Sequence, residues 1–321
     1  MRAAAVLAVA CAAAACSRPH EPTGGPPELP LRPIAVVAGS RGLRHTYKVE
    51  GGSTARAAVV IEARLARLLP AGTAHVAADG ERVVVDLPAA DAGSLERLAD
   101  VIAAPGSFAV HEVALGNQTM GALLDHAVSD ERAVSRGVGV DHERWSSPDQ
   151  SVVDDRFLVA SDRAALEAYV AEATADAALR LPTGVEVRTQ AVAAVPVRWR
   201  TFAVVARPTL DSAAIRRTSV RQLPAGDLVV ELALDDAGRK AFAALTRQLV
   251  GQKLALIVDG VISSAPIVMG EIAGGKLYVA VAPGDQADGD ALRTAEDLAV
   301  TLGSGPLPGR LLLESSTVAP D

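Results

Sequence analysis

The chain has 321 residues, of which 50% are hydrophobic and 3% aromatic, and its 31 lysines and arginines against 38 aspartates and glutamates give a net charge of −7. The basic residues are scattered, whereas a nucleic-acid surface needs a basic face with stacking aromatic side chains, so we expect no nucleic-acid partner. The only cysteines, Cys11 and Cys16, lie near the N-terminus. The rest of the chain therefore has neither a disulfide framework nor a cysteine-based zinc site.

Residues 1–15 are typical of a cleaved export signal. Arg2 precedes an apolar run at residues 3–15, which is shorter than the roughly 20 residues that a transmembrane helix needs. Cys16, at the polar end of this run, resembles the processing site of a bacterial lipoprotein, and Cys11 is the alternative attachment site. The other interpretation is an ordinary secretory signal that is removed together with both cysteines. We expect a lipid-anchored protein of the cell envelope that faces the periplasm, with Ser17 favouring the outer membrane.

Residues 16–42 are rich in proline and glycine and show no hydrophobic period. This composition predicts an extended linker. Such a linker would hold the globular part of the protein away from a membrane surface.

Residues 43–115 alternate between strand-like and helix-like patterns. Two helices are predicted by apolar residues at helical spacing, and the turn Asp79-Gly80 between two short apolar runs indicates a hairpin. The predicted elements are strands at 44–49, 74–77, 82–87 and 107–113 and helices at 54–69 and 94–103. Their order is βαββαβ, which is the ferredoxin-like plan of two helices on one face of an antiparallel sheet.

Residues 116–205 are less regular and predict an inserted α+β region. Its clearest element is a helix at 162–175, with Leu166, Tyr169 and Ala173 on one face. Short strands are predicted near 156–159, 186–188 and 199–205. Trp145 and Trp199 could anchor an unfolded chain, but packing against the sheet is the favoured interpretation.

Residues 206–321 repeat the βαββαβ order. The predicted elements are strands at 228–232, 253–258, 261–267, 277–281 and 311–314 and helices at 236–250 and 288–302. The turn Asp259-Gly260 predicts a tight hairpin, because such a turn needs positive φ at both central residues. Gly303 is expected to end the last helix by adopting positive φ. The fold class predicted for the whole chain is α+β, with two ferredoxin-like halves and an inserted subdomain.

Catalytic and cofactor patterns are weak. Ser304 lies between two glycines but follows a helix, so it does not have the strand-to-helix setting of a nucleophile elbow. Gly270, Gly274 and Gly275 are not followed by the lysine and hydroxyl residue of a phosphate-binding loop. His142, between Asp141 and Glu143, is better explained as part of a solvated loop than as a metal ligand. We therefore expect no enzyme activity, no cofactor and no metal.

Several segments in order resemble the SecD protein-export family. The strongest are Gly238-Arg239-Lys240-Ala241-Phe242, the Asp259-Gly260 hairpin and the ending Gly305-Pro306-Leu307-Pro308. The resemblance runs from about residue 43 to residue 320 and covers the first periplasmic domain of the family. It implies that residues 43–115 are base-like, that residues 116–205 are an insertion leading into the head, and that residues 206–321 hold the head-like region and C-terminal base-like elements. It implies that the domain captures an emerging polypeptide, and we expect no proton-driven membrane motor in this chain.

The main hypothesis from the sequence is a non-enzymatic periplasmic lipoprotein that binds extended polypeptide as an auxiliary of Sec-dependent export. Backbone pairing at an open sheet edge would suit clients of arbitrary sequence. The resemblance implies secretory polypeptides, and possible contact with the Sec translocon, as partners. The alternative is an envelope interaction module with one folded partner and no export role. The sequence does not identify the residues that would bind polypeptide.

Overall fold

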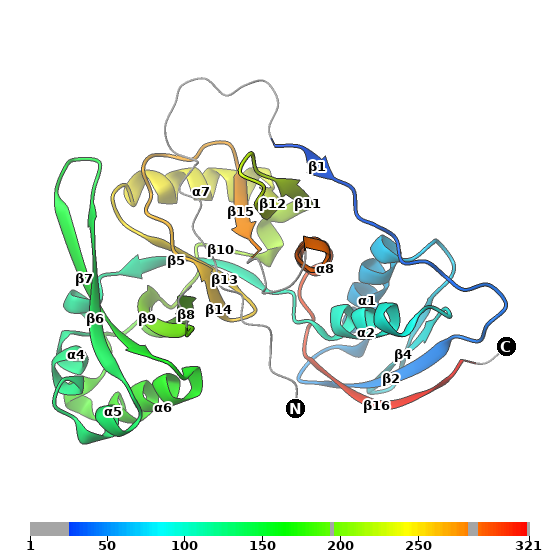
Figure 1. Cartoon of the computed structure of the whole chain (residues 1–321), viewed down its shortest axis with the longest axis horizontal. Coiled ribbons are helices and arrows are strands. Elements are labelled where there is room, and N and C mark those ends of the chain that lie inside the picture. Colours follow the sequence, from blue (N-terminus) through cyan, green and yellow to red (C-terminus); the bar gives the residue numbers. More distant parts are fainter. Residues whose placement is uncertain (1–25, 193–195, 282–287, 320–321) are drawn as a thin grey trace.

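The computed structural model describes residues 26–192, 196–281 and 288–319 and consists of three antiparallel sheets with helices packed against them (Figure 1). Cys11, Cys16 and the expected signal lie outside these residues. Within them, no helix is long and apolar enough to cross a membrane. We call the sheets 1, 2 and 3 in the order in which they are described below.

Sheet 1 has the strand order β16-β2-β4-β3, with β2 at Leu43–Glu50, β3 at His75–Asp79, β4 at Arg82–Leu87 and β16 at Arg310–Val318. Helices α1 (Thr54–Leu68) and α2 (Ala92–Ala103) cover one of its faces. In α1, Ala57, Ile61, Leu65 and Leu68 are buried, and the Ser53 hydroxyl accepts a hydrogen bond from the Arg56 amide at the start of the helix. The predicted limits of β2, β3, β4, α1 and α2 agree with the structure to within two residues, whereas β16, predicted at 311–314, continues to Val318.

Sheet 1 differs from the expected plan in its edge strand. The strand predicted at 107–113 is β5 (Phe108–Ala114), but it belongs to sheet 2. There it pairs with β13 (Leu254–Val258), β10 (Leu210–Asp211) and β9 (Arg198–Val205). β16, from the opposite end of the sequence, takes the place beside β2. Burial explains the exchange. Phe108 and Val110 are buried on one face of β5 and His111 and Val113 on the other, whereas residues 313–318 of β16 are exposed, as is usual for an edge strand.

Sheet 2 has eight strands and extends from the centre of the molecule into a side lobe. Its main order is β14-β13-β5-β9-β7-β6, with β10 beside β5 and β8 beside β9. Its other bounds are β6 Gly139–Ser146, β7 Val152–Ala160, β8 Val185–Val192, β9 Arg198–Val205, β10 Leu210–Asp211, β13 Leu254–Val258 and β14 Val261–Ser264.

The side lobe contains the inserted region. Its helices are α3 Gly116–Thr119, α4 Gly121–Ala127, α5 Glu131–Ser135, α6 Arg163–Ala173 and the 3-10 turn η1 Ala177–Leu179. Trp199 is buried in the core of this lobe. The Trp145 indole donates to the Gly251 carbonyl at 2.9 Å and lies against the buried Lys253 ammonium, 4.4 Å from the ring centroid. Both tryptophans therefore pack within the protein.

Sheet 3 has the order β1-β11-β12-β15, with β1 at Glu28–Leu29, β11 at Ile215–Gln222, β12 at Leu228–Leu234 and β15 at Lys276–Ala280. The 3-10 turn η2 (Ser212–Ala214) leads into it, and α7 (Asp236–Gln248) and α8 (Asp288–Gly303) complete this part of the molecule. The strands of the expected second βαββαβ unit do not share one sheet, because β12 and β15 join sheet 3 while β13 and β14 join sheet 2.

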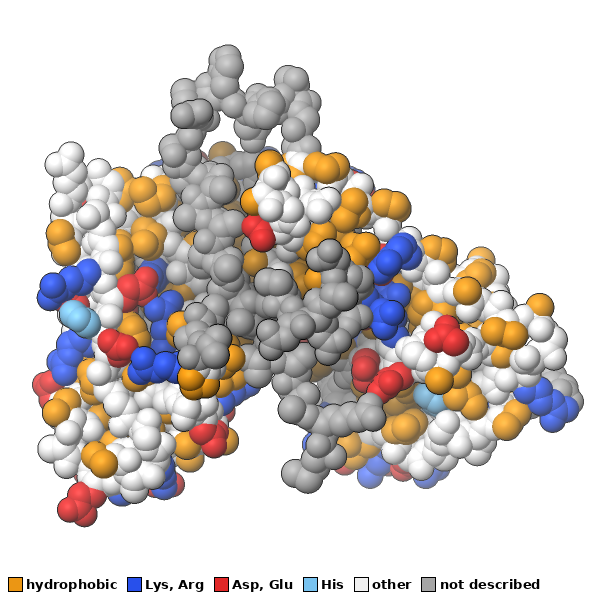
Figure 2. All heavy atoms as spheres, viewed as in Figure 1, with side chains coloured by type: hydrophobic (Ala, Val, Ile, Leu, Met, Phe, Trp, Pro, Cys, Tyr) orange, Lys and Arg blue, Asp and Glu red, His pale blue; other side chains and the backbone are white. Residues whose placement is uncertain are grey.

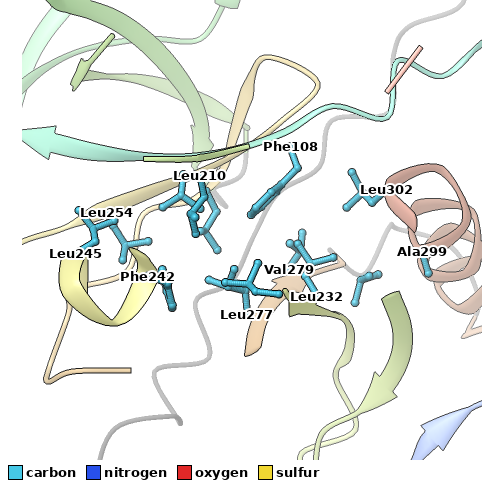
Figure 3. Packing of buried hydrophobic residues seen from close by; sticks show 14 of the residues in the cluster. Phe108, Leu210, Leu232, Phe242, Leu245, Leu254, Leu277, Val279, Ala299 and Leu302 are labelled. Atoms are coloured by element: carbon cyan, nitrogen blue, oxygen red, sulfur yellow. The ribbon is translucent and has the colours of Figure 1, made fainter. Parts of the chain in front are cut away.

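The central core lies between sheets 2 and 3. Phe108 of β5 and Leu254 of β13 meet Leu232, Leu277 and Val279 of sheet 3 there, with side chains of α7 and α8 at either side (Figure 3). Because the C-terminal strands are divided between sheets 2 and 3, each of these sheets buries one face against the other.

Candidate polypeptide-binding edge

The edge of sheet 3 is occupied by a segment of the chain that the sequence predicts to be part of a free linker. Glu28 and Leu29 form β1 and lie opposite Arg221 and Val220 of β11 in an antiparallel pair, and the Gln222 amide donates to the Pro27 carbonyl at 3.4 Å. Proline cannot donate to a ladder and is confined to the edges of sheets. The protein thus holds an extended, proline-rich segment by strand addition.

Glu28 attaches this segment through charge as well as backbone. Its carboxylate lies 2.6 Å from Arg217 Nη2 and 3.2 Å from Arg221 Nη2. Arg221 also donates to the Pro26 carbonyl at 3.1 Å and to Glu231 of β12 at the same distance. Two arginines of β11 therefore recognise one carboxylate on the added strand.

The chain leaves the edge immediately after Leu29. The Arg32 amide and guanidinium donate to the buried Glu296 carboxylate of α8, and the Ile34 amide donates to the Leu68 carbonyl at 2.7 Å. Ile34 is only 4% exposed. Residues 26–34 are extended, as predicted, but they pack along sheet 3 and α1 and are not free.

A cavity of about 410 Å³ lies beside the part of β11 that β1 does not cover. Its walls are residues 28–31, residues 216–220 of β11, Arg67 at the end of α1 and Gly303 at the end of α8. Figure 2 shows Lys and Arg side chains gathered on this side of the molecule, where sheet 3 meets the helices of sheet 1. The cavity thus lies next to the part of the β11 edge that β1 occupies.

Arginines dominate the polar lining of this cavity. Arg67 donates to the Ala299 carbonyl and to the Thr218 hydroxyl, both at 3.0 Å, and burial lowers its pKa. Arg216 is exposed, and no residue in the described part of the chain bonds to it. Arg217 pairs with Glu28. Three cations therefore face one carboxylate, in a protein whose net charge is negative.

Gly303 contributes to this cavity in a different way from the one predicted. It is the last residue of α8 and does not have positive φ; Gly305, two residues later, has φ +82°. A Cβ on Gly303 would lie 2.0 Å from Arg67 Nη1 and 2.3 Å from Thr218 Oγ1. The expectation of a left-handed cap at Gly303 is wrong, because glycine is required there for the close approach of α8 to α1 and β11.

Asp259 and Gly260 lie away from this edge, in the turn between β13 and β14, with φ of +50° and +79°. The Asp259 carboxylate also accepts from the Ser107 amide at 2.7 Å and from the Ser107 hydroxyl at 3.2 Å. Burial raises its pKa. Asp259 therefore also ties the hairpin to the start of β5, a contact that its turn motif does not reveal.

The residues considered for chemistry are not brought together. The Ser304 hydroxyl is buried and has no hydrogen-bond partner, so no base contacts it. His142 pairs with Asp154 at 3.1 Å. Across residues 26–192, 196–281 and 288–319, no group of three His, Cys, Asp or Glu side chains could hold a metal.

Sequence reasoning missed Glu28 and the whole of β11. The signal was present in two places: Leu29, Leu31 and Ile34 are too apolar for a free linker, and the alternation of Arg217, Ser219 and Arg221 places them on one face of a strand. Fold and site together define a mixed α/β domain of antiparallel sheets, with an arginine-rich edge that holds extended chain.

Residues 190–309 match the family model described as SecDF, P1 head subdomain. Over these residues the chain is therefore similar to the head subdomain of the SecD/SecDF protein-export family. This confirms the resemblance found in the sequence.

The curated relatives include SecD subunits of several bacteria. The protein translocase subunit SecD of Sebaldella termitidis is 34% identical over 110 residues, which cover 34% of this chain and 25% of that subunit. The SecD of Calditerrivibrio nitroreducens is 30% identical over 132 residues, covering 41% and 23% of the two chains. The matched region thus spans about a quarter of the length of these relatives.

Two solved structures share the fold. A crystal structure of SecDF in a super-membrane-facing form has a TM-score of 0.54 and 19% identity, over 86% of this chain and 30% of that one. A second structure, of a SecDF described as a membrane component that enhances protein export, has a TM-score of 0.53 and 18% identity, over 85% of this chain and 98% of that one.

Proposed function

We propose that this domain binds extended polypeptide at the β11 edge of sheet 3, as an auxiliary of Sec-dependent protein export. The observation that carries the proposal is β1 itself: an extended segment with three nearby prolines already pairs with β11 and is held by Arg217 and Arg221. A client would take the place of β1. Main-chain pairing supplies affinity for many sequences, and side chains beside the edge add preference.

The position of β1 makes such replacement physically reasonable. β1 pairs through two residues only, and one of them, Glu28, keeps 39% of its side chain exposed. A two-residue strand contributes few hydrogen bonds, and each is worth about 1 kcal/mol net. A longer client strand could pair with more of β11 and so displace β1.

The order β16-β2-β4-β3 supports a ferredoxin-like plan for sheet 1, in which β16 is the fourth strand. We propose that sheet 1 with α1 and α2 is the base-like part of the domain and that sheet 3 with its flanking elements belongs to the head-like part. The match of residues 190–309 to the head model supports this division.

The binding proposal is tested with one secretory protein in two states. The exported protein should bind an unfolded, non-refolding form of the client and not the native form of the same client, as measured by fluorescence anisotropy. The reason is that only an unfolded chain offers free extended backbone. Equal binding to both forms, or binding to neither, would refute the proposal; a single stoichiometric partner in a pull-down from envelope extract would instead favour the interaction module.

We further propose that Cys16 is acylated and tethers the domain to the envelope, facing the periplasm. The apolar run at residues 3–15 before Cys16 supports this. Labelling of cells with a radioactive fatty acid should mark the wild-type protein and not Cys16→Ser, while Cys11→Ser should remain labelled. Unchanged labelling of Cys16→Ser would exclude this attachment site, and membrane fractionation would identify the membrane, for which we favour the outer one.

A further inference from the structure

Arginine side chains line the part of the β11 edge that β1 leaves uncovered, and the inference drawn from them rests on the proposed binding of extended polypeptide. In the register of β1, Glu28 lies opposite Arg221 and Leu29 opposite Val220. Continuing that register would place residue 30 opposite Ser219 and residue 32 opposite Arg217. The cavity beside residues 216–220 is therefore where the next residues of an added strand would lie.

The chain's own segment cannot use this space. In that register Pro30 falls in a non-hydrogen-bonded pair, so its missing amide hydrogen costs the ladder no bond. Arg32 would stand opposite Arg217, and like charges directly opposite each other in an antiparallel pair are destabilising. Arg32 instead turns to α8, where its Nε donates to the Glu296 carboxylate at 2.8 Å. The charge of Arg32 thus gives a local cause for the departure of the chain after Leu29.

The arginines at the cavity lack the acidic partners that arginines usually find. Arg216 has no bonding partner among the described residues, and Arg67 donates to a carbonyl and a hydroxyl. Arg217 has a single carboxylate, that of Glu28. If a client displaced β1, Glu28 would leave with it, and Arg217 would lose this partner as well.

We infer that this edge selects extended segments with acidic side chains, one opposite Arg221 and a second four residues later, opposite Arg217 and within reach of Arg216. Residues i and i+4 of a strand lie on the same face, so both carboxylates would point to the arginine side of β11. Guanidinium groups bind carboxylates through paired, charge-assisted hydrogen bonds. In this chain Glu28 supplies the first carboxylate, opposite Arg221. The second carboxylate, opposite Arg217, would come only from a client.

Two synthetic peptides test this inference on the full exported protein. Both have the sequence of residues 26–33, one with Arg32→Glu and the other with Arg32→Gln, and each carries a fluorophore for anisotropy. The Arg32→Glu peptide should bind about tenfold more tightly, since a hydrogen-bonded charge pair contributes about 1.5 kcal/mol or more. High salt should reduce the difference between the two peptides.

Protein variants assign the effect to the cavity. Arg216→Ala should remove most of the preference for the acidic peptide, and Arg216→Lys should retain part of it, because lysine keeps the charge and loses the bidentate geometry. Arg310→Ala on β16 is the control for net charge, since Arg310 is also exposed but lies in sheet 1. It should leave the preference unchanged.

The outcomes separate this inference from the proposed function. Equal affinity for the two peptides, or no binding of either, would overturn the acidic preference; if the unfolded client still binds in parallel assays, polypeptide binding stands. Loss of both peptide and client binding overturns both. Displacement of the acidic peptide by inorganic phosphate at the same concentration as by unlabelled peptide would indicate a general anion site and would also overturn the inference.

Discussion

Replacement of Arg64 by methionine (Arg64→Met) is expected to lower the free energy of unfolding by about 3 kcal/mol. Arg64 is completely buried in α1. Its Nη1 donates to the carbonyls of Val101 at 2.8 Å and Ile102 at 3.1 Å, at the end of α2, where helix carbonyls lack intrahelical partners. Methionine fills a similar volume and supplies no donor.

Arg64 also joins two of the connections between sheet 1 and the rest of the molecule. Its guanidinium donates to Ala104 and Pro105 on the outgoing chain and to Gly305 on the returning chain. Burial lowers the pKa of Arg64 to about 10, so keeping this cation inside has a cost that the substitution removes. Because several buried carbonyls would lose their donor, we expect the unsatisfied acceptors to outweigh that relief.

Urea denaturation followed by circular dichroism measures the change. Arg56→Met is the matched control, because Arg56 is exposed on the same helix and should change stability by less than about 0.5 kcal/mol. A loss below about 1 kcal/mol for Arg64→Met would mean that water or backbone movement satisfies the carbonyls, and that Arg64 does not hold the two connections.

A disulfide that locks β1 onto β11 is expected to abolish most client binding. Glu28 and Arg221 are directly opposite each other. Since the Gln222 amide donates to the neighbouring Pro27 carbonyl, the 28–221 pair is of the non-hydrogen-bonded kind, in which side chains are closest. The double variant Glu28→Cys/Arg221→Cys should therefore form a disulfide and hold β1 in place.

Oxidised and reduced forms of this double variant provide the comparison. The oxidised form should bind the unfolded client at least about tenfold more weakly than the reduced form, because a client cannot displace a covalently held strand. Glu28→Ala should shift affinity in the opposite direction, since β1 loses both arginine contacts. Equal binding by the oxidised and reduced forms would show that the client does not use the β11 edge.

Local elements were predictable because their causes are local. The helix predicted at 54–69 forms at Thr54–Leu68, and the strand predicted at 82–87 forms exactly there, since apolar spacing and capping residues act over a few positions. Asp162 likewise caps α6 by accepting from the amides of Ala164 and Ala165. The family resemblance was also available from segments such as Gly238-Arg239-Lys240-Ala241-Phe242, which are contiguous in the chain.

The candidate site was not predictable in the same way. Glu28 and Arg217 are 189 positions apart, and only the folded chain brings them to 2.6 Å. A short proline-rich segment resembles a linker in any composition-based view, whether or not an edge strand exists to receive it. Because the sequence did not predict β11, it gave no strand with which Glu28 could pair.

By itself, the sequence determined the type and position of most helices and strands, the absence of cysteines beyond Cys16, and the likeness to the SecD family. Tertiary structure alone decided which strands share a sheet: β16 replaces β5 beside β2, and β1 is added to β11. The physical reason is that a strand's own residues specify its pleat and its apolar face. Its neighbours are chosen by burial and charge on segments far away in the chain.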